Sequence, residues 1–191
     1  MQQRGLVLIS SAKVTKMDKV CMVVDLEGFT VDKRFYVREL GAFDWKGRRC
    51  NYKFFMPMPF ESLSDRDRRS VRYVTRHVHG LPFKPKGFEL AMSQQYVEQT
   101  LMNLYRRSKT ETLDVVGYKG GHVEREMLRK LNIPSLDIEA FGCPKVERLF
   151  HSGMNGTNGC GQHEGQVHCS TLECELFWWW VTDYLEENDR H

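Results

Sequence analysis

The segment at residues 160–175 constrains the fold most, because it places metal-ligand side chains next to a loop with little apolar content. Residues 151–166 are rich in Gly, Asn and Ser, and a loop of this composition buries too little apolar surface to fold alone. Zinc takes thiolate and imidazole ligands in tetrahedral geometry, and Cys160, His163 and Cys169 supply three of the four. We therefore predict a structural zinc that orders this loop.

The length of the chain suits one domain. Its 191 residues, of which 41% are hydrophobic and 12% aromatic, are enough to bury a full core. We expect a single domain over residues 1–191, with the zinc-stabilised loop at about 151–169. Six cysteines, unevenly spread and partly clustered near two histidines, favour a metal site in a reducing compartment over a disulfide framework.

Hydropathy argues against a membrane partner. No stretch approaches the roughly 20 consecutive apolar residues that span a bilayer. The apolar run at residues 5–9 is too short for a signal peptide. These features predict an intracellular protein, cytoplasmic or nuclear.

The formal net charge of +3 permits a nucleic-acid partner without indicating one, so the position of the basic residues matters more than their number. Residues 64–77 read as a helix capped by Ser64 and contain five arginines. A solvated helix face is the simpler interpretation of these arginines, and a phosphate-contacting face is the alternative.

Hydrophobic patterning predicts an α/β fold. Residues 6–10 form a first apolar run, and the later runs and periodic segments give the expected elements. These are strands at 20–26, 35–40 and 51–56, helices at 64–77 and about 88–105, a strand at 113–118, a helix at 123–131, a strand at 133–138, a short helical piece at 143–150 and a closing helix at about 170–187. Three antiparallel strands followed by alternating helices and strands give a mixed sheet flanked by helices.

The closing helix carries a strongly apolar body that includes three consecutive tryptophans, residues 178–180. Such a run suggests base stacking, but aromatic side chains dominate core burial. We expect these tryptophans to pack in the core.

Asp25 and Glu27 stand at the end of the β-branched run 20–24. Residues two apart on a strand point to the same side, so these carboxylates could share a divalent cation. An acidic strand-to-turn junction is the plainer interpretation, unless acids elsewhere in the chain join the pair.

Three motifs supply such partners, and together they resemble the DEDDh exonuclease family. Residues 23–28 look like its first motif, in which an Asp and a Glu on the first strand bind metal. Residues 116–128 are similar to its second motif, with Glu124 where the family usually has Asp. His168 followed five residues later by Glu173 matches the last motif, again with Glu in place of Asp.

The resemblance implies a ribonuclease H-like fold and a 3′-5′ exonuclease that acts on RNA or DNA. Asp25, Glu27, Glu124 and Glu173 would hold two Mg²⁺ or Mn²⁺ ions, and His168 would accept the proton of the attacking water. Nucleic acid is then the expected partner, with RNA favoured over DNA.

A second resemblance concerns the zinc ligands. Maelstrom domains and arenavirus nucleoprotein exonucleases share this fold, and in them a Glu on the second strand completes a Glu-Cys-His-Cys site. Glu39 lies in the matching place, with Cys174 and His151 as alternative fourth ligands. This resemblance implies a second function, a catalytically degenerate Maelstrom-like RNA-binding domain of the small-RNA and transposon-silencing type. A zinc-stabilised interaction module without nucleic acid is a third, plainer reading.

Overall fold

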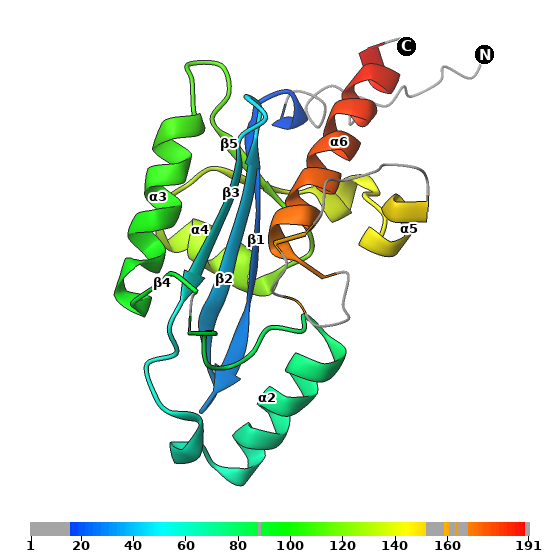
Figure 1. Ribbon diagram of the computed structural model, residues 1–191. Helices are drawn as coiled ribbons and strands as arrows, with labels where there is room; N and C mark the ends of the chain where they lie inside the picture. The colour runs from blue at the N-terminus through cyan, green and yellow to red at the C-terminus, as the bar shows by residue number, and fades with distance from the viewer. Residues whose placement is uncertain (1–15, 88, 152–158, 161–162, 164–167, 190–191) are drawn as a thin grey trace, which may run out of the picture.

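A computed structural model describes residues 16–87, 89–151, 159–160, 163 and 168–189. Its centre is a six-stranded mixed sheet in the order β4-β3-β2-β1-β5-β6 (Figure 1). The first three strands form an antiparallel meander. The fourth strand pairs in parallel with the third, the fifth with the first, and the sixth with the fifth. In chain order the strands are β1 (Val20–Val31), β2 (Arg34–Asp44), β3 (Arg49–Phe54), β4 (Ala91–Met92), β5 (Val115–Tyr118) and β6 (Ser135–Asp137). The predicted α/β class and antiparallel start are confirmed.

Helices cover both faces of this sheet. α6 (Ser170–Asp189) and α5 (Val146–His151) lie on one side, and α3 (Val97–Ser108) and α4 (His122–Lys130) lie on the other (Figure 1). α2 (Asp65–His77) lies beyond α6, near the hairpin end of β1. Each helix contributes apolar residues to a core cluster on its own face of the sheet.

The alternation of side chains along β1 decides what each helix covers. Met22, Val24 and Leu26 belong to the core cluster beneath α3 and α4. From Val23 onward, the odd-numbered residues point to the opposite face. Of these, Val23 packs in the cluster beneath α6, while Phe29 and Val31 pack in the cluster beneath α2. The two odd positions between them are Asp25 and Glu27, so these acids face the gap between α6 and α2.

Most expected elements are present with shifted ends. α2 begins after Ser64, whose side chain accepts a hydrogen bond from the Asp67 amide, as the cap pattern predicts. β1 and β2 run farther than expected, because residues 32–33 form a two-residue hairpin turn in which both residues have positive φ. The apolar run at residues 6–10 lies outside the described residues.

One predicted helix is wrong over its first half. The helix expected from about residue 88 begins only at Val97, after the short strand β4 and the 3₁₀ turn Gln94–Tyr96. The Gln94 side-chain amide donates to the carbonyls of Val37 and Phe55 and so holds this segment against the sheet edge. The apolar residue that suggested a helical face, Leu90, is 94% exposed.

The closing helix is confirmed as α6, but one of its tryptophans departs from the prediction. Leu176 and Phe177 are buried, and Trp178 and Trp180 pack against the core, whereas Trp179 is 47% exposed. Trp179 faces outward because consecutive helix residues point about 100° apart, so a run of three cannot lie on one face. None of the helices in the described part of the chain is long and apolar enough to cross a membrane.

Candidate metal centre and acidic cleft

Strand register brings three charged side chains into one row across the sheet. Glu27 of β1 pairs with Glu39 of β2, and Glu39 pairs with Lys53 of β3. Residues directly opposite each other on antiparallel strands share a face, with their Cβ atoms about 5 Å apart. Glu39 therefore stands between an acid of the candidate nuclease motif and a lysine that sequence reasoning missed.

Four potential ligands meet around Glu39. One ligand atom from each residue lies within 4.8 Å of the others in what we call the Glu39 cluster, formed by Glu39, Cys160, His163 and Cys169. Glu39 is fully buried, and its Oε1 accepts a hydrogen bond of 3.0 Å from the Ser170 amide at the start of α6. Its Oε2 lies 3.4 Å from Cys160 Sγ, and both of its oxygens lie 3.1 Å from His163 Nε2. This cluster could hold a metal ion.

The orientation of His163 suits a metal ligand. Its Nδ1 hydrogen-bonds to the carbonyl oxygen of His79, so Nδ1 carries the proton and Nε2 presents its lone pair to the cluster. His79 is itself fully buried; its Nε2 donates to the Gly28 carbonyl and its Nδ1 accepts from the Leu81 amide. Burial lowers the pKa of His79 to about 4 and keeps it neutral. Sequence reasoning missed His79 because its contact with His163 is made by the backbone.

Lys53 supplies a positive charge beside the Glu39 cluster. Its Nζ lies 3.2 Å from Cys160 Sγ and forms an ion pair with Glu39 Oε2. Only 7% of the Lys53 side chain is exposed. A divalent cation held by two thiolates, one carboxylate and a neutral imidazole carries a net charge of −1, which the Lys53 ammonium balances.

The other candidate ligands differ in environment. The hydrogen bond from Cys160, joined by one from His163, lowers the pKa of Cys169 to about 3, which favours the thiolate that metals bind. Cys174 is fully buried on α6, and burial raises the pKa of its thiol. Cys174 is not part of the group, and the His151 side chain lies outside the described residues. The geometry therefore favours Glu39 as the fourth ligand.

A second set of acids, here called the acidic cluster, lies beside the first: Asp25, Glu27, Glu124 and Glu173. Glu124, in the first turn of α4, is tied to β1 because its Oε1 accepts a 3.0 Å hydrogen bond from the Leu26 amide. Glu173, in the first turn of α6, is brought to β1 by Gly41, the residue of β2 that pairs with Asp25. A Cβ atom on Gly41 would lie 2.4 Å from the Ser170 backbone carbon, so only glycine lets α6 begin this close to the sheet.

The acidic cluster crowds carboxyl groups into a buried space. Burial, and then repulsion from Glu173, Glu27 and Glu124, raises the pKa of Asp25 well above its ordinary value. Burial, followed by the charges of Glu173 and Glu124, raises the pKa of Glu27 to about 8. Within the described part of the chain, Asp25 Oδ2 is the one buried side-chain oxygen or nitrogen without a hydrogen-bond partner. A buried carboxylate oxygen without a donor, close to three other carboxyl groups, fits a hard divalent cation such as Mg²⁺ or Mn²⁺.

An open cleft of about 280 Å³ gives solvent access to part of this cluster. Asp25, Glu173 and His168 line it, whereas Glu27 and Glu124 do not. Sequence reasoning also missed other residues of its wall, which are Lys119, Lys145, Val146, Glu147 and Phe177. Lys145 and Lys119, the latter paired with Glu139 at 3.1 Å, add positive charge to the wall of this cleft.

His168 is held between two carboxylates. Its Nδ1 lies 2.6 Å from Glu173 Oε1, and its Nε2 lies 3.5 Å from Glu147 Oε1. The hydrogen bond to Glu173 is the main reason that the pKa of His168 is raised. The structure thus places His168 beside Glu173, and both line the cleft together with Asp25.

No protein-family model matches the chain, and no curated protein matches it either.

Proposed function

We propose that this chain is a metal-dependent nuclease with a ribonuclease H-like fold, acting as a 3′-5′ exonuclease on RNA or DNA. One observation carries the proposal: acids from β1, from α4 on one side of the sheet and from α6 on the other come together at β1, and Asp25 Oδ2 is buried there without a partner. The antiparallel meander followed by parallel strands also supports it.

Asp25, Glu27, Glu124 and Glu173 would hold Mg²⁺ or Mn²⁺, which supplies Lewis-acid stabilisation and lowers the pKa of a bound water when present. His168 would accept the proton of the attacking water at Nε2, because Glu173 holds Nδ1 and strengthens the imidazole as a base. Lys119 and Lys145 would attract the phosphates of the substrate into the cleft.

The Glu39 cluster would bind a structural zinc. Its ligands are two thiolates, an imidazole and a carboxylate, a set that zinc binds in closed tetrahedral sites. Cys169 directly follows His168 and precedes α6, so a metal held there would fix the backbone that presents His168 and Glu173.

A Maelstrom-like RNA-binding domain is the second candidate function. Glu stands in place of the family's Asp at positions 124 and 173, and the hydrogen bond between Glu173 and His168 occupies two groups that catalysis requires. The extra methylene of each Glu moves a carboxylate by about 1 Å, and a displacement of that size can cost 100-fold in rate.

A cleavage assay separates the two candidates. With Mn²⁺, the protein is expected to shorten a 5′-labelled RNA strand stepwise from its 3′ end. Asp25→Ala is expected to slow this at least about 100-fold, because it removes a ligand that metal-assisted transfer needs. Glu187→Ala, which removes an exposed acid near the end of α6, is the matched control.

Cleavage that persists undiminished in Asp25→Ala would overturn the two-metal assignment. RNA binding without cleavage in either Mn²⁺ or Mg²⁺ would favour the RNA-binding domain.

A further inference from the structure

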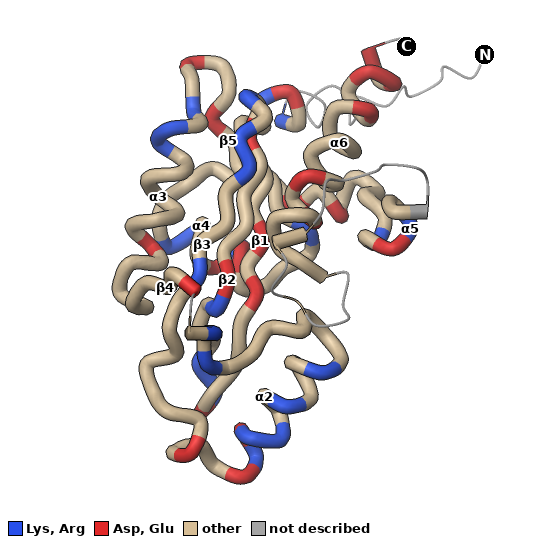
Figure 2. The backbone as a smooth tube through the Cα atoms, in the orientation of Figure 1, with Lys and Arg blue, Asp and Glu red and all other residues tan. Residues whose placement is uncertain are grey.

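α2 concentrates positive charge far beyond its share of the chain. Its five arginines against two aspartates leave a 13-residue helix with a net charge of +3, equal to the formal charge of the whole chain. Both aspartates lie in the first turn, where Asp65 pairs with Arg68 and Asp67 bonds with Ser64. The other four arginines of the helix are exposed: Arg66, Arg69, Arg72 and Arg76. Figure 2 shows basic residues at several places along α2.

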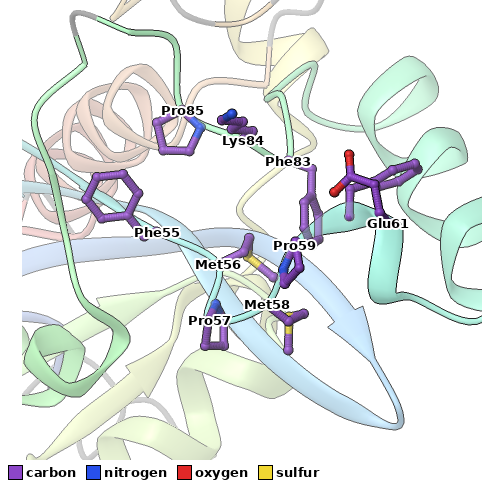
Figure 3. Close-up of a pocket in the computed structure, with 10 residues that line it drawn as sticks. Phe55, Met56, Pro57, Met58, Pro59, Glu61, Phe83, Lys84 and Pro85 are labelled. Atoms are coloured by element: carbon purple, nitrogen blue, oxygen red, sulfur yellow. The ribbon is translucent and has the colours of Figure 1, made fainter.

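An apolar cavity opens beside this helix. It measures about 500 Å³ and is walled by Phe55, Phe60 and Phe83 together with two methionines and three prolines (Figure 3). Phe55 is 48% exposed, so its ring is accessible at the mouth. Lys84 and Glu61 also line the cavity, so its own charged residues balance and the positive charge of this region comes from α2.

The cavity and the arginines form one continuous surface. A second hollow of about 390 Å³ shares Phe60 and Phe83 with the first and is completed by the α2 residues Val71, Arg72, Thr75 and Arg76. The Arg72 guanidinium lies 5.4 Å above the Phe60 ring. Aromatic faces and arginines therefore alternate from the cavity onto α2.

This surface lies on the same side of the sheet as the acidic cluster. Phe29 and Val31, which pack beneath α2, follow Asp25 and Glu27 on the same face of β1. The step from Glu27 to Phe29 is about 7 Å along the strand. The α2 surface and the acidic cluster are therefore neighbours along the same face of β1.

We propose that α2 and the Phe55–Phe60–Phe83 cavity form a nucleic-acid exosite outside the acidic cleft. Arginines of α2 contact phosphates, and the cavity receives an unpaired base. The exosite proposal rests on the proposed nuclease function and adds a binding site for the substrate strand. Arginine and aromatic side chains together bind single strands, in which bases are free to stack, whereas a duplex keeps its bases paired. An acidic peptide would satisfy the arginines but would not fill the aromatic cavity.

The test measures binding separately from cleavage. Anisotropy of a fluorescein-labelled oligo-uridine is followed with Asp25→Ala protein, in which the strand stays intact. In that background, Arg69→Gln with Arg72→Gln is expected to weaken binding about tenfold and to reduce the salt slope by about 1.4, since each single-strand phosphate contact contributes about 0.7. Phe55→Ala is expected to weaken binding about tenfold with the salt slope unchanged, because a stacked base is lost.

The matched control is Arg106→Gln with Arg129→Gln, which removes two exposed arginines from α3 and α4. An equal loss of affinity in this control would overturn the exosite, since it would show a general charge effect. Equal affinity for a duplex of the same length, or equal competition by polyglutamate, would also overturn it. Binding that depends on α2 in a protein that cleaves nothing would support the exosite while the nuclease proposal fails. Cleavage with KM unchanged by the α2 substitutions would leave the nuclease and overturn the exosite.

Discussion

The Glu39 cluster and the acidic cluster share one face of β1 and β2 but compensate their charges differently. Every ligand of the Glu39 cluster has a hydrogen-bond partner, and Lys53 supplies a nearby positive charge. The acidic cluster has a buried oxygen without a partner and mutually raised pKa values. We propose that the first arrangement suits a metal that stays bound for folding and that the second suits an exchangeable cation.

Removing the zinc ligands should break this contrast most strongly. Cys160→Ala is expected to lose the metal and to lower the melting temperature by about 10 °C or more, because a structural metal contributes directly to folding and each kcal/mol shifts Tm by about 2–4 °C at this size. Metal analysis and thermal melts measure both effects.

Cys50→Ala, which removes a half-buried cysteine outside the cluster, serves as the control. Wild-type protein that purifies without zinc, or a Cys160→Ala variant that melts like wild type, would contradict the structural assignment.

A substitution at Lys53 tests whether its ammonium group balances the negative charge of the metal-bound Glu39 cluster. Lys53→Met keeps most of the side-chain volume but leaves the bound metal complex with a net charge of −1. We expect zinc affinity to fall about tenfold, as for other residues that support metal ligands. Competition with a chromophoric chelator measures the affinity. In Lys53→Arg, which keeps the positive charge, zinc affinity should fall less than in Lys53→Met. Equal zinc affinity in Lys53→Met and wild type would show that Lys53 is not the counter-ion.

The acidic cluster should give the metal-free protein a distinctive pH dependence. The folded-state pKa of Glu27 is raised from 4.5 to about 8, so the folded protein binds a proton that the unfolded chain releases. The resulting stability is fully present below about pH 4.5 and is lost as the pH rises through about 8. Urea unfolding in chelating buffer should show this decline between about pH 5 and 8.

Glu27→Gln should flatten the decline of stability with pH. Mn²⁺ should reduce this decline, because the cation replaces the proton as the compensating charge. A decline of the same size in Glu27→Gln would assign it to other groups.

The sequence predicts the parts of the site that depend on local pattern. Alternation along a strand places Asp25 and Glu27 on one side, and short spacing places Cys160, His163 and Cys169 together. Lys53 and the His79 carbonyl escape prediction because strand register and a backbone contact, rather than a motif, bring them to the cluster. The error in predicting a helix before Val97 has a similar cause, since the Gln94 side chain fixes that segment by hydrogen bonds to two carbonyls distant in sequence.

Gly41 makes the two clusters mechanically inseparable. The backbone at residues 170–171 rests directly on it, and that short piece of chain carries the amide that holds Glu39 on one side and leads into Glu173 on the other. A side chain at position 41 would push the first turn of α6 away from the sheet and displace the carboxylates of Glu39 and Glu173 together. A single methyl group, placed on a residue that belongs to neither cluster, would thus displace both clusters in one step.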